Sequence, residues 1–251
     1  MNKDEMTIVT GGGRGIGRAI ALRMARETAV TVVGRTQSDL ISVCHEVEMA
    51  GGSALFCTGD VTDPATADLA SLAWSSHRVR NLVLNAGIGK SALPHEYDTA
   101  LFQSIMDVNV MGAFHFIKAF VPKMIENGGG NIILMSSVSG LVGSKRNAPY
   151  TASKHALVGF AKGMAQDYGA QGIVTVAICP GYVETAMTER SIQKRVELHG
   201  ISREEARTKI ERINPQHRLI QPEEVAEMIA FVCSGLVPSL SGSAIVLSGG
   251  A

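Results

Sequence analysis

The sequence lacks several features that would each indicate a particular class of protein. It has no net charge, because 23 lysines and arginines balance 23 aspartates and glutamates, and no basic run stands out. This balance gives no indication of a nucleic-acid or membrane partner. No uninterrupted apolar run is long enough to cross a bilayer, and the initial MNKDEMTIVTGGG has no apolar region of a signal peptide. We therefore expect a cytoplasmic protein.

Cysteine and metal-binding patterns are scarce as well. The four cysteines, Cys44, Cys57, Cys179 and Cys233, are scattered and form no CxxC pair. Such a distribution is more typical of buried, unpaired thiols than of a disulfide framework or a zinc site. The seven histidines are also dispersed, with no pair at metal-ligand spacing near an acidic residue. We expect no catalytic metal.

The sequence does have enough apolar residues for a large core. It is 45% hydrophobic and 18% charged, which argues against disorder. Short β-branched runs recur, mostly continuous rather than alternating, as in strands covered on both faces. The predicted strands are Met6–Thr10, Val30–Val33, Ala54–Cys57, Leu82–Asn85, Ile132–Ser136, Val174–Cys179 and Ala244–Ser248, and the helical segments between them include Ile16–Glu27, Leu40–Ala50 and Tyr150–Tyr168. This alternation predicts a single domain over residues 1–251, with a doubly wound, Rossmann-like parallel sheet of seven strands flanked by helices.

One segment, Thr185–Pro215, departs from the alternation. It is polar, mixed in charge and helical in period, and Gly200 interrupts it. Ser202 and Glu205 have the spacing of a capping box that opens a second helix. An insertion of this length in a compact α/β domain is usually a lid or a binding element, although a solvated hairpin used in assembly is the alternative. We interpret residues 185–215 as a short helical lid over the substrate.

A glycine-rich segment, Thr10–Gly17, follows the first predicted strand and leads into a helix. Its glycines permit positive φ and let the backbone approach a pyrophosphate at the helix N-terminus. The spacing departs from the GxGxxG fingerprint, so the position after the first strand carries the prediction of a dinucleotide site. The residues assigned to the cofactor here are Gly11, Arg14, Gly15, Ile16 and Gly17.

The end of the second strand bears on which cofactor binds. An NAD site usually has an acidic residue there, which accepts a hydrogen bond from the ribose 2′-hydroxyl. This sequence has Val33-Gly-Arg-Thr36 instead, with no carboxylate before Asp39. Arg35 could bind a 2′-phosphate through its planar charged fork, and Arg14 could reach the same phosphate from the other side. Each could be an ordinary surface arginine, but together with the missing carboxylate they favour NADP(H).

A tyrosine and a lysine, Tyr150 and Lys154, share one face of a predicted helix because they are four residues apart. An ammonium beside a phenol should lower the pKa of the phenol. Tyr150 could then donate a proton to a carbonyl oxygen as hydride arrives, or accept one during alcohol oxidation. Ser137 could donate a hydrogen bond to the developing alkoxide. Ser136 is the competing candidate, and it should point to the other side of the strand.

Together these motifs resemble one family, the short-chain dehydrogenases/reductases, over essentially the whole chain. The motifs that stand in the order and spacing of the family are Thr10–Gly17, Asn85–Gly87, Ser137, Tyr150–Lys154 and Pro180–Gly181. Each alone is unspecific, whereas TGxxxGxG with YxxxK and a serine thirteen residues before the tyrosine is highly specific. Residues Ala148–Thr185 are especially similar to bacterial β-ketoacyl reductases and polyketide ketoreductases.

The resemblance implies roles for individual residues. The catalytic set is Asn109, Ser137, Tyr150 and Lys154, with Lys154 also binding the nicotinamide ribose and Asn109 holding a water that links Lys154 to solvent. Asn109 could instead cap a turn, and Asp60 could be an ordinary loop acid. The further cofactor residues are Asp60 and Val61 along the adenine, Asn85 beside the adenosine ribose with Ala86 and Gly87 after it, and Pro180, Gly181, Val183 and Thr185 in the loop that holds the carboxamide. The family often has two asparagines before Ala-Gly, where this chain has Leu84-Asn85.

The predicted function is an NADP(H)-dependent reductase of a ketone, which could be a 3-oxoacyl thioester, a polyketide or a cyclic ketone. The alternatives are a catabolic secondary-alcohol dehydrogenase and, from a different class, an inactive module that senses nucleotides. Two arginines that dock an acyl carrier protein in related reductases are replaced here by Gly128 and Gln171, which weakens a role in fatty-acid synthesis, although Lys145, Arg146 and Arg190 could substitute for them. The resemblance also implies a homotetramer, or a dimer, that packs through helices around Ala100–Lys118 and Tyr150–Tyr168.

Overall fold

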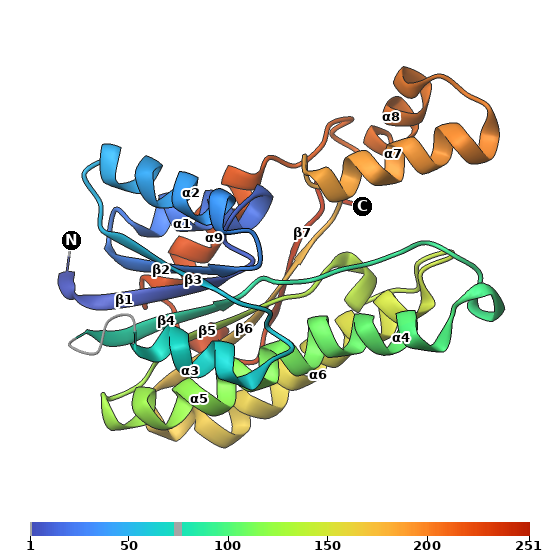
Figure 1. Ribbon diagram of the computed structural model, residues 1–251. Coiled ribbons are helices and arrows are strands. Elements are labelled where there is room, and N and C mark those ends of the chain that lie inside the picture. The colour runs from blue at the N-terminus through green and yellow to red at the C-terminus, as the bar shows by residue number, and fades with distance from the viewer. Residues whose placement is uncertain (1, 73–76) are drawn as a thin grey trace.

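The computed structural model describes residues 2–72 and 77–251 and contains a parallel sheet covered by helices on both faces (Figure 1). The strand order is β3-β2-β1-β4-β5-β6-β7. The strands are β1 Asn2–Thr10, β2 Thr28–Gly34, β3 Ala54–Thr58, β4 Arg78–Leu84, β5 Gly130–Met135, β6 Ile173–Pro180 and β7 Ala244–Leu247. All seven predicted strands are therefore confirmed, as is the doubly wound α/β fold.

The helices divide between the two faces of the sheet. One face carries α1 Gly15–Met24, α2 Gln37–Met49 and α9 Pro222–Cys233, and the other carries α3 Pro64–Leu72, α4 Thr99–Met106, α5 Gly112–Glu126 and α6 Ala148–Tyr168 (Figure 1). Neighbouring strand residues therefore face two different cores: Ile8 and Ile132 belong to one, and Val9 and Ile133 to the other. This arrangement explains why the strands read as continuous apolar runs.

Helix boundaries differ from the sequence prediction by a few residues. The helix predicted over Ile16–Glu27 ends at Met24, because β2 already begins at Thr28 and the chain must turn before it. Short 3₁₀ helices occupy several loops. Their bounds are Pro94–Glu96, Val138–Gly140, Gly169–Gln171 and Pro238–Leu240.

A π-helical turn, Asp107–Met111, joins α4 and α5 into one continuous helix. Within the described residues, this helix, Thr99–Glu126, is long and apolar enough to cross a membrane by length and composition alone. Its side chains Phe116, Phe120 and Met124 are fully buried against the sheet. It is therefore a core helix of this fold.

The segment between β6 and α9 forms a helical hairpin, as the sequence predicts. It consists of α7 Ala186–His199 and α8 Arg203–Glu211, and it projects from the body of the molecule beyond the ends of β6 and β7 (Figure 1). Gly200 ends α7 with a left-handed φ of 61°, and the Ser202 hydroxyl caps α8 by accepting from Glu205 N at 3.1 Å. The hairpin packs around a small apolar cluster of its own, made by Ile192, Ala206, Ile210 and Leu219.

Candidate active site

The glycine-rich loop after β1 is shaped by close packing rather than by composition alone. Gly11 and Gly15 both have positive φ, 64° and 53°. A Cβ atom on Gly17 would collide with the carbonyl oxygen of Gly11, so the first turn of α1 can lie directly on the loop only with glycine there. Arg14 precedes α1 in extended conformation and its side chain does not cap the helix. The loop thus places the N-terminus of α1, which favours anions, at the carboxyl end of β1.

Asn85 fixes this loop to the end of β4. Its side-chain amide donates to the carbonyls of Thr10 at 3.0 Å and Gly11 at 3.2 Å. The backbone N–H groups of Asn85 and Ala86 both donate to the Thr10 hydroxyl, at 3.0 and 3.1 Å. Asn85, assigned from the sequence to the adenosine ribose, therefore directs its amide to the glycine loop and holds it in shape.

The predicted adenine end of the site lies at the ends of β2 and β3. Arg35 is 66% exposed at its side chain, and its Nη1 lies 3.7 Å from Oδ2 of Asp60. The other carboxylate oxygen of Asp60 accepts from the backbone N–H of Thr62 at 3.0 Å and from its hydroxyl at 2.9 Å. These bonds from Thr62, with a smaller contribution from Arg35, hold the pKa of Asp60 below its usual value. Val61, next along the chain, is buried.

Tyr150 and Lys154 lie one turn apart on α6, as their spacing predicts. The Lys154 ammonium is 5.5 Å from the centroid of the Tyr150 ring and donates to the Met135 carbonyl at 2.6 Å. Only 4% of Lys154 is exposed. Ser137, at the end of β5, hydrogen-bonds the Tyr150 phenol, and its hydroxyl also lies 3.4 Å from the Pro180 carbonyl. The structure thus brings the predicted serine, tyrosine and lysine together.

The expected direction of the tyrosine pKa is wrong. Although part of Tyr150 reaches solvent, the surrounding protein raises the pKa of its phenol, and the hydrogen bond with Ser137 opposes this only in part. Burial also lowers the pKa of Lys154 to about 8. Desolvation penalises the charged form of both groups and is the largest cause of each shift. At neutral pH, Tyr150 is therefore a protonated phenol that can donate.

Asn109 lies in the π-helical turn and is 1% exposed. Its side-chain oxygen accepts from Ile88 N at 2.8 Å, and its nitrogen donates to the Ile88 carbonyl at 3.0 Å and to the Ser153 hydroxyl at 2.9 Å. A Cβ atom on Gly87 would lie 3.3 Å from both Asn109 Oδ1 and Lys154 Nζ, so the three residues meet. The water that the resemblance assigns to Asn109 stays a prediction.

Two serines that sequence reasoning did not assign to the site bond the backbone of the catalytic helix. Ser153 donates to the Tyr150 carbonyl at 2.8 Å, and Ser136 donates to the Lys154 carbonyl at 2.8 Å. Ser136 is buried and bonds α6, whereas the Ser137 hydroxyl lies near the Pro180 carbonyl in the loop after β6; that the two point to opposite sides of the strand stays a prediction. A Cβ atom on Gly140 would collide with the Ser136 hydroxyl. In the sequence, the only indication of these contacts was Gly140, which closely follows the two serines.

The loop after β6 closes the other side of the site. Gly181 N donates to the Leu247 carbonyl at 2.8 Å, which ties the loop to β7. Val183 is buried and forms an isolated parallel bridge with Ile220, on the returning segment of the hairpin. The methyl group of Thr185 would lie 3.3 Å from a Cβ atom placed on Gly15. The predicted carboxamide loop therefore lies against the glycine loop on one side and Ser137 on the other.

These positions fit a nicotinamide dinucleotide. A glycine-rich loop at a helix N-terminus suits the pyrophosphate, because Gly11 and Gly17 let the loop, the end of β4 and the first turn of α1 pack closely enough to present that N-terminus. Ile16, in the first turn of α1, is half-buried and packs against the core. Across the described residues, no group of three or more His, Cys, Asp or Glu side chains could hold a metal ion. The four cysteines are buried and unpaired, as predicted.

Comparisons with known proteins agree with this arrangement. A profile of the short chain dehydrogenase family matches residues 5–196. An A-factor type gamma-butyrolactone 1′-reductase (1S-forming) from Streptomyces virginiae is 34% identical, over 98% of this chain and 95% of the relative. A 3-oxoacyl-acyl-carrier-protein reductase from Thermotoga maritima is 31% identical, over 98% of this chain and 97% of the relative.

Solved structures give the same result. A variant of actinorhodin polyketide ketoreductase with NADPH has a TM-score of 0.94 and 32% identity, over 98% of this chain and 96% of that one. L-sorbose reductase from Gluconobacter frateurii, complexed with NADPH and L-sorbose, has a TM-score of 0.92 and 26% identity, over 99% and 96%. The likeness thus extends through the sheet, the candidate site and the α7–α8 hairpin.

Proposed function

This chain belongs to the short-chain dehydrogenase/reductase family, whose members act on carbonyl or alcohol substrates with a nicotinamide cofactor, and we propose that it reduces a ketone with NADPH. The observation that carries the proposal is the group Ser137, Tyr150 and Lys154, gathered at the edge of the sheet beside the glycine loop. A protonated phenol in this place suits proton donation, the reductive direction.

The chemistry divides between the cofactor and the protein. When bound, the nicotinamide would supply the hydride for the carbonyl carbon. Tyr150 gives its phenolic proton to the carbonyl oxygen, and Ser137 donates a hydrogen bond to the same oxygen as negative charge develops there. Lys154 binds the ribose hydroxyls, and its positive charge stabilises the phenolate that remains until Tyr150 takes up a proton again. Asn109 holds α6 through Ser153 and completes the set.

The preference for NADPH over NADH rests on two exposed arginines. Arg35 follows β2 where an NAD site usually has a carboxylate, and Arg14 lies in the glycine loop. We expect Arg35→Ala to weaken NADPH binding by about 1.5–3 kcal/mol, as for a charge-assisted hydrogen bond, and NADH binding far less. Fluorescence titration with the two cofactors measures this, with NADH as the internal control. Equal losses would show that Arg35 does not bind the phosphate.

The proposed substrate is a 3-oxoacyl thioester, a polyketide or a cyclic ketone. The support is that relatives include a butyrolactone reductase, an acyl-carrier-protein reductase and a polyketide ketoreductase. Gly128 and Gln171, where carrier docking would require arginines, are exposed, so the surface offers no such pair there. This favours a substrate that is not delivered by an acyl carrier protein.

The rest of the proposal concerns organisation. We treat residues 1–251 as one cytoplasmic oxidoreductase domain with residues 185–215 as the substrate lid. We also propose a homotetramer, or a dimer, formed through α4, α5 and α6. Phe102, Met111 and Phe114 are each 40% exposed or more on these helices, and the Phe114 ring lies 6.4 Å from that of Phe160. Light scattering with Phe114→Asp tests it: a wild-type monomer, or an unchanged assembly in the variant, would contradict the interface.

The test of the activity is a ketone panel with NADPH, comparing wild type with Tyr150→Phe. We expect turnover of at least one ketone by wild type and its near-complete loss in the variant, since the aromatic ring remains but the hydroxyl that donates the proton is gone. Unchanged turnover in the variant would refute the mechanism. Cofactor binding without turnover of any ketone would favour a nucleotide sensor.

A further inference from the structure

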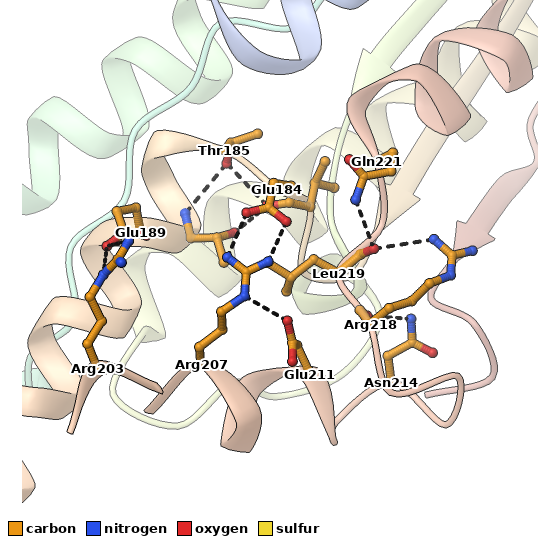
Figure 2. Close-up of polar contacts among 12 residues, drawn as sticks. Glu184, Thr185, Glu189, Arg203, Arg207, Glu211, Asn214, Arg218, Leu219 and Gln221 are labelled. Atoms are coloured by element: carbon orange, nitrogen blue, oxygen red, sulfur yellow. Dashed lines mark hydrogen bonds and ion pairs between the residues drawn. The ribbon is translucent and has the colours of Figure 1, made fainter. Parts of the chain in front are cut away.

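An ion pair joins Glu184, in the segment between β6 and α7, to Arg207 of the α7–α8 hairpin (Figure 2). Glu184 lies between Val183 and Thr185, and its two carboxylate oxygens accept from Nη1 and Nη2 of Arg207 at 2.8 and 2.6 Å. A third donor of the guanidinium, Nε, donates to Oε1 of Glu211 at 2.8 Å. A planar fork with two matched carboxylates fixes the position of Glu184 in a way that a point charge could not.

The inner side of the same segment faces the site. Thr185 lies against Gly15 of the glycine loop and begins α7, where its hydroxyl accepts from Thr188 N at 3.5 Å. The Thr188 hydroxyl donates a hydrogen bond to the Val183 carbonyl at 2.5 Å. The segment 183–185 therefore has two sides, one against the proposed cofactor and one held by Arg207.

Apolar packing of α8 holds the backbone of Arg207 in place. Its neighbours on α8, Ala206 and Ile210, are fully buried in the apolar cluster of the hairpin. The Arg207 guanidinium holds the pKa of Glu184 below its usual range, so the pair stays charged at neutral pH. The backbone of Glu184 is also bound, because its N–H donates to the Ile220 carbonyl at 2.8 Å. Without Arg207, this backbone bond and the side-chain hydrogen bond between Glu184 and Gln221 would hold the outer side of the segment.

We propose that Arg207 is a positioning residue of the cofactor site, acting through Glu184 on the loop that holds the nicotinamide carboxamide. This inference rests on the proposed function, since it concerns cofactor contacts of Val183 and Thr185. Arg207 touches no cofactor. It restricts the conformations of residues 183–185 before binding, so that these residues lose less conformational entropy when the nicotinamide binds.

The experiment compares Arg207→Met with wild type, because methionine keeps an unbranched apolar side chain and removes the fork. We expect the Kd for NADPH to rise about two- to fivefold, the range of a part-exposed ion pair. Binding of adenosine 2′,5′-bisphosphate, which lacks the nicotinamide, should not change. A general loss of folding would weaken both ligands, so this split separates positioning from stability.

Two further variants sharpen the result. Arg203→Met removes a comparable ion pair from α8, with Glu189 of α7 at 2.9 Å, and Arg203 makes no bond to residues 183–185, so the NADPH affinity of this variant should equal that of wild type. Glu184→Gln should repeat the loss of Arg207→Met, and the double variant should lose no more than either single one.

The outcomes are distinct. Wild type that binds no NADPH would overturn the proposed function and this inference together. Wild type that binds NADPH, with Arg207→Met binding it equally well, would overturn the inference alone. Equal weakening by Arg203→Met, or weaker binding of adenosine 2′,5′-bisphosphate by Arg207→Met, would also overturn it, because the effect would then belong to the hairpin or to the whole fold.

Discussion

The adjacent serines at the end of β5 should respond to alanine in opposite ways. The Ser137 hydroxyl bonds the Tyr150 phenol. Its other role is to cap a three-residue 3₁₀ helix by accepting from Ser139 N at 3.2 Å. We expect Ser137→Ala to lower kcat/KM for ketone reduction about 10²–10³-fold, as for loss of one donor to a developing oxyanion. Stability should fall by less than about 1 kcal/mol, because the structural bonds lost are this short cap and the long contact with the Pro180 carbonyl at 3.4 Å.

Ser136→Ala should do the reverse. Its hydroxyl is buried and donates to the Lys154 carbonyl at 2.8 Å, so alanine removes one buried hydrogen bond without leaving an unpaired donor. The cost is about 1 kcal/mol, which lowers Tm by about 2–4 °C in a chain of this size. The Lys154 ammonium keeps its bond to the Met135 carbonyl at 2.6 Å. We therefore expect kcat/KM to fall by about tenfold at most, or 1.4 kcal/mol.

The assay measures Tm by calorimetry and kcat/KM with NADPH and the preferred ketone, on both variants and wild type. Each variant is the control for the other, since they differ by one position and by the same lost hydroxyl. A stable but inactive Ser136→Ala protein, beside an active Ser137→Ala protein, would refute the assignment. Equal losses of activity would show that both hydroxyls act through the position of α6.

Three other predictions concern the core, the pH dependence of stability and that of activity. Asn131→Ala should lower the free energy of unfolding by about 2–4 kcal/mol in urea denaturation. The buried Asn131 amide donates to Asn81 Oδ1 at 2.8 Å, and its removal leaves that oxygen unpaired. An unchanged midpoint would contradict this. The fork of Arg218 lowers the pKa of Glu224 from 4.5 to about 2, so Glu224→Gln should be less stable than wild type above pH 4.5, and the difference should disappear as the pH falls toward 2; a constant difference would contradict it. Burial lowers the pKa of Lys154 to about 8, so kcat/KM should decline as the pH rises through that value and the ammonium is lost, whereas a flat profile up to pH 10 would exclude a role for the charge.

Local patterns determined much of this protein in advance. The seven strands follow from continuous apolar runs, because a strand covered on both faces needs apolar residues at every position. The turn between α7 and α8 follows from Gly200 and Ser202, whose conformation and capping depend only on their neighbours. Tyr150 and Lys154 share a face because helical periodicity alone places them there. Each of these features depends on residues close together in the chain.

The tertiary structure decided the features that depend on contacts between distant segments. The strand order, the bond from Ser136 to Lys154 and the fork between Glu184 and Arg207 each join residues whose proximity no local pattern encodes. The pKa of Tyr150 belongs to the same group, and its expected direction was wrong. The spacing of Tyr150 and Lys154 placed an ammonium near a phenol, but desolvation is set by everything that surrounds both groups, and only the folded chain determines how much water is left.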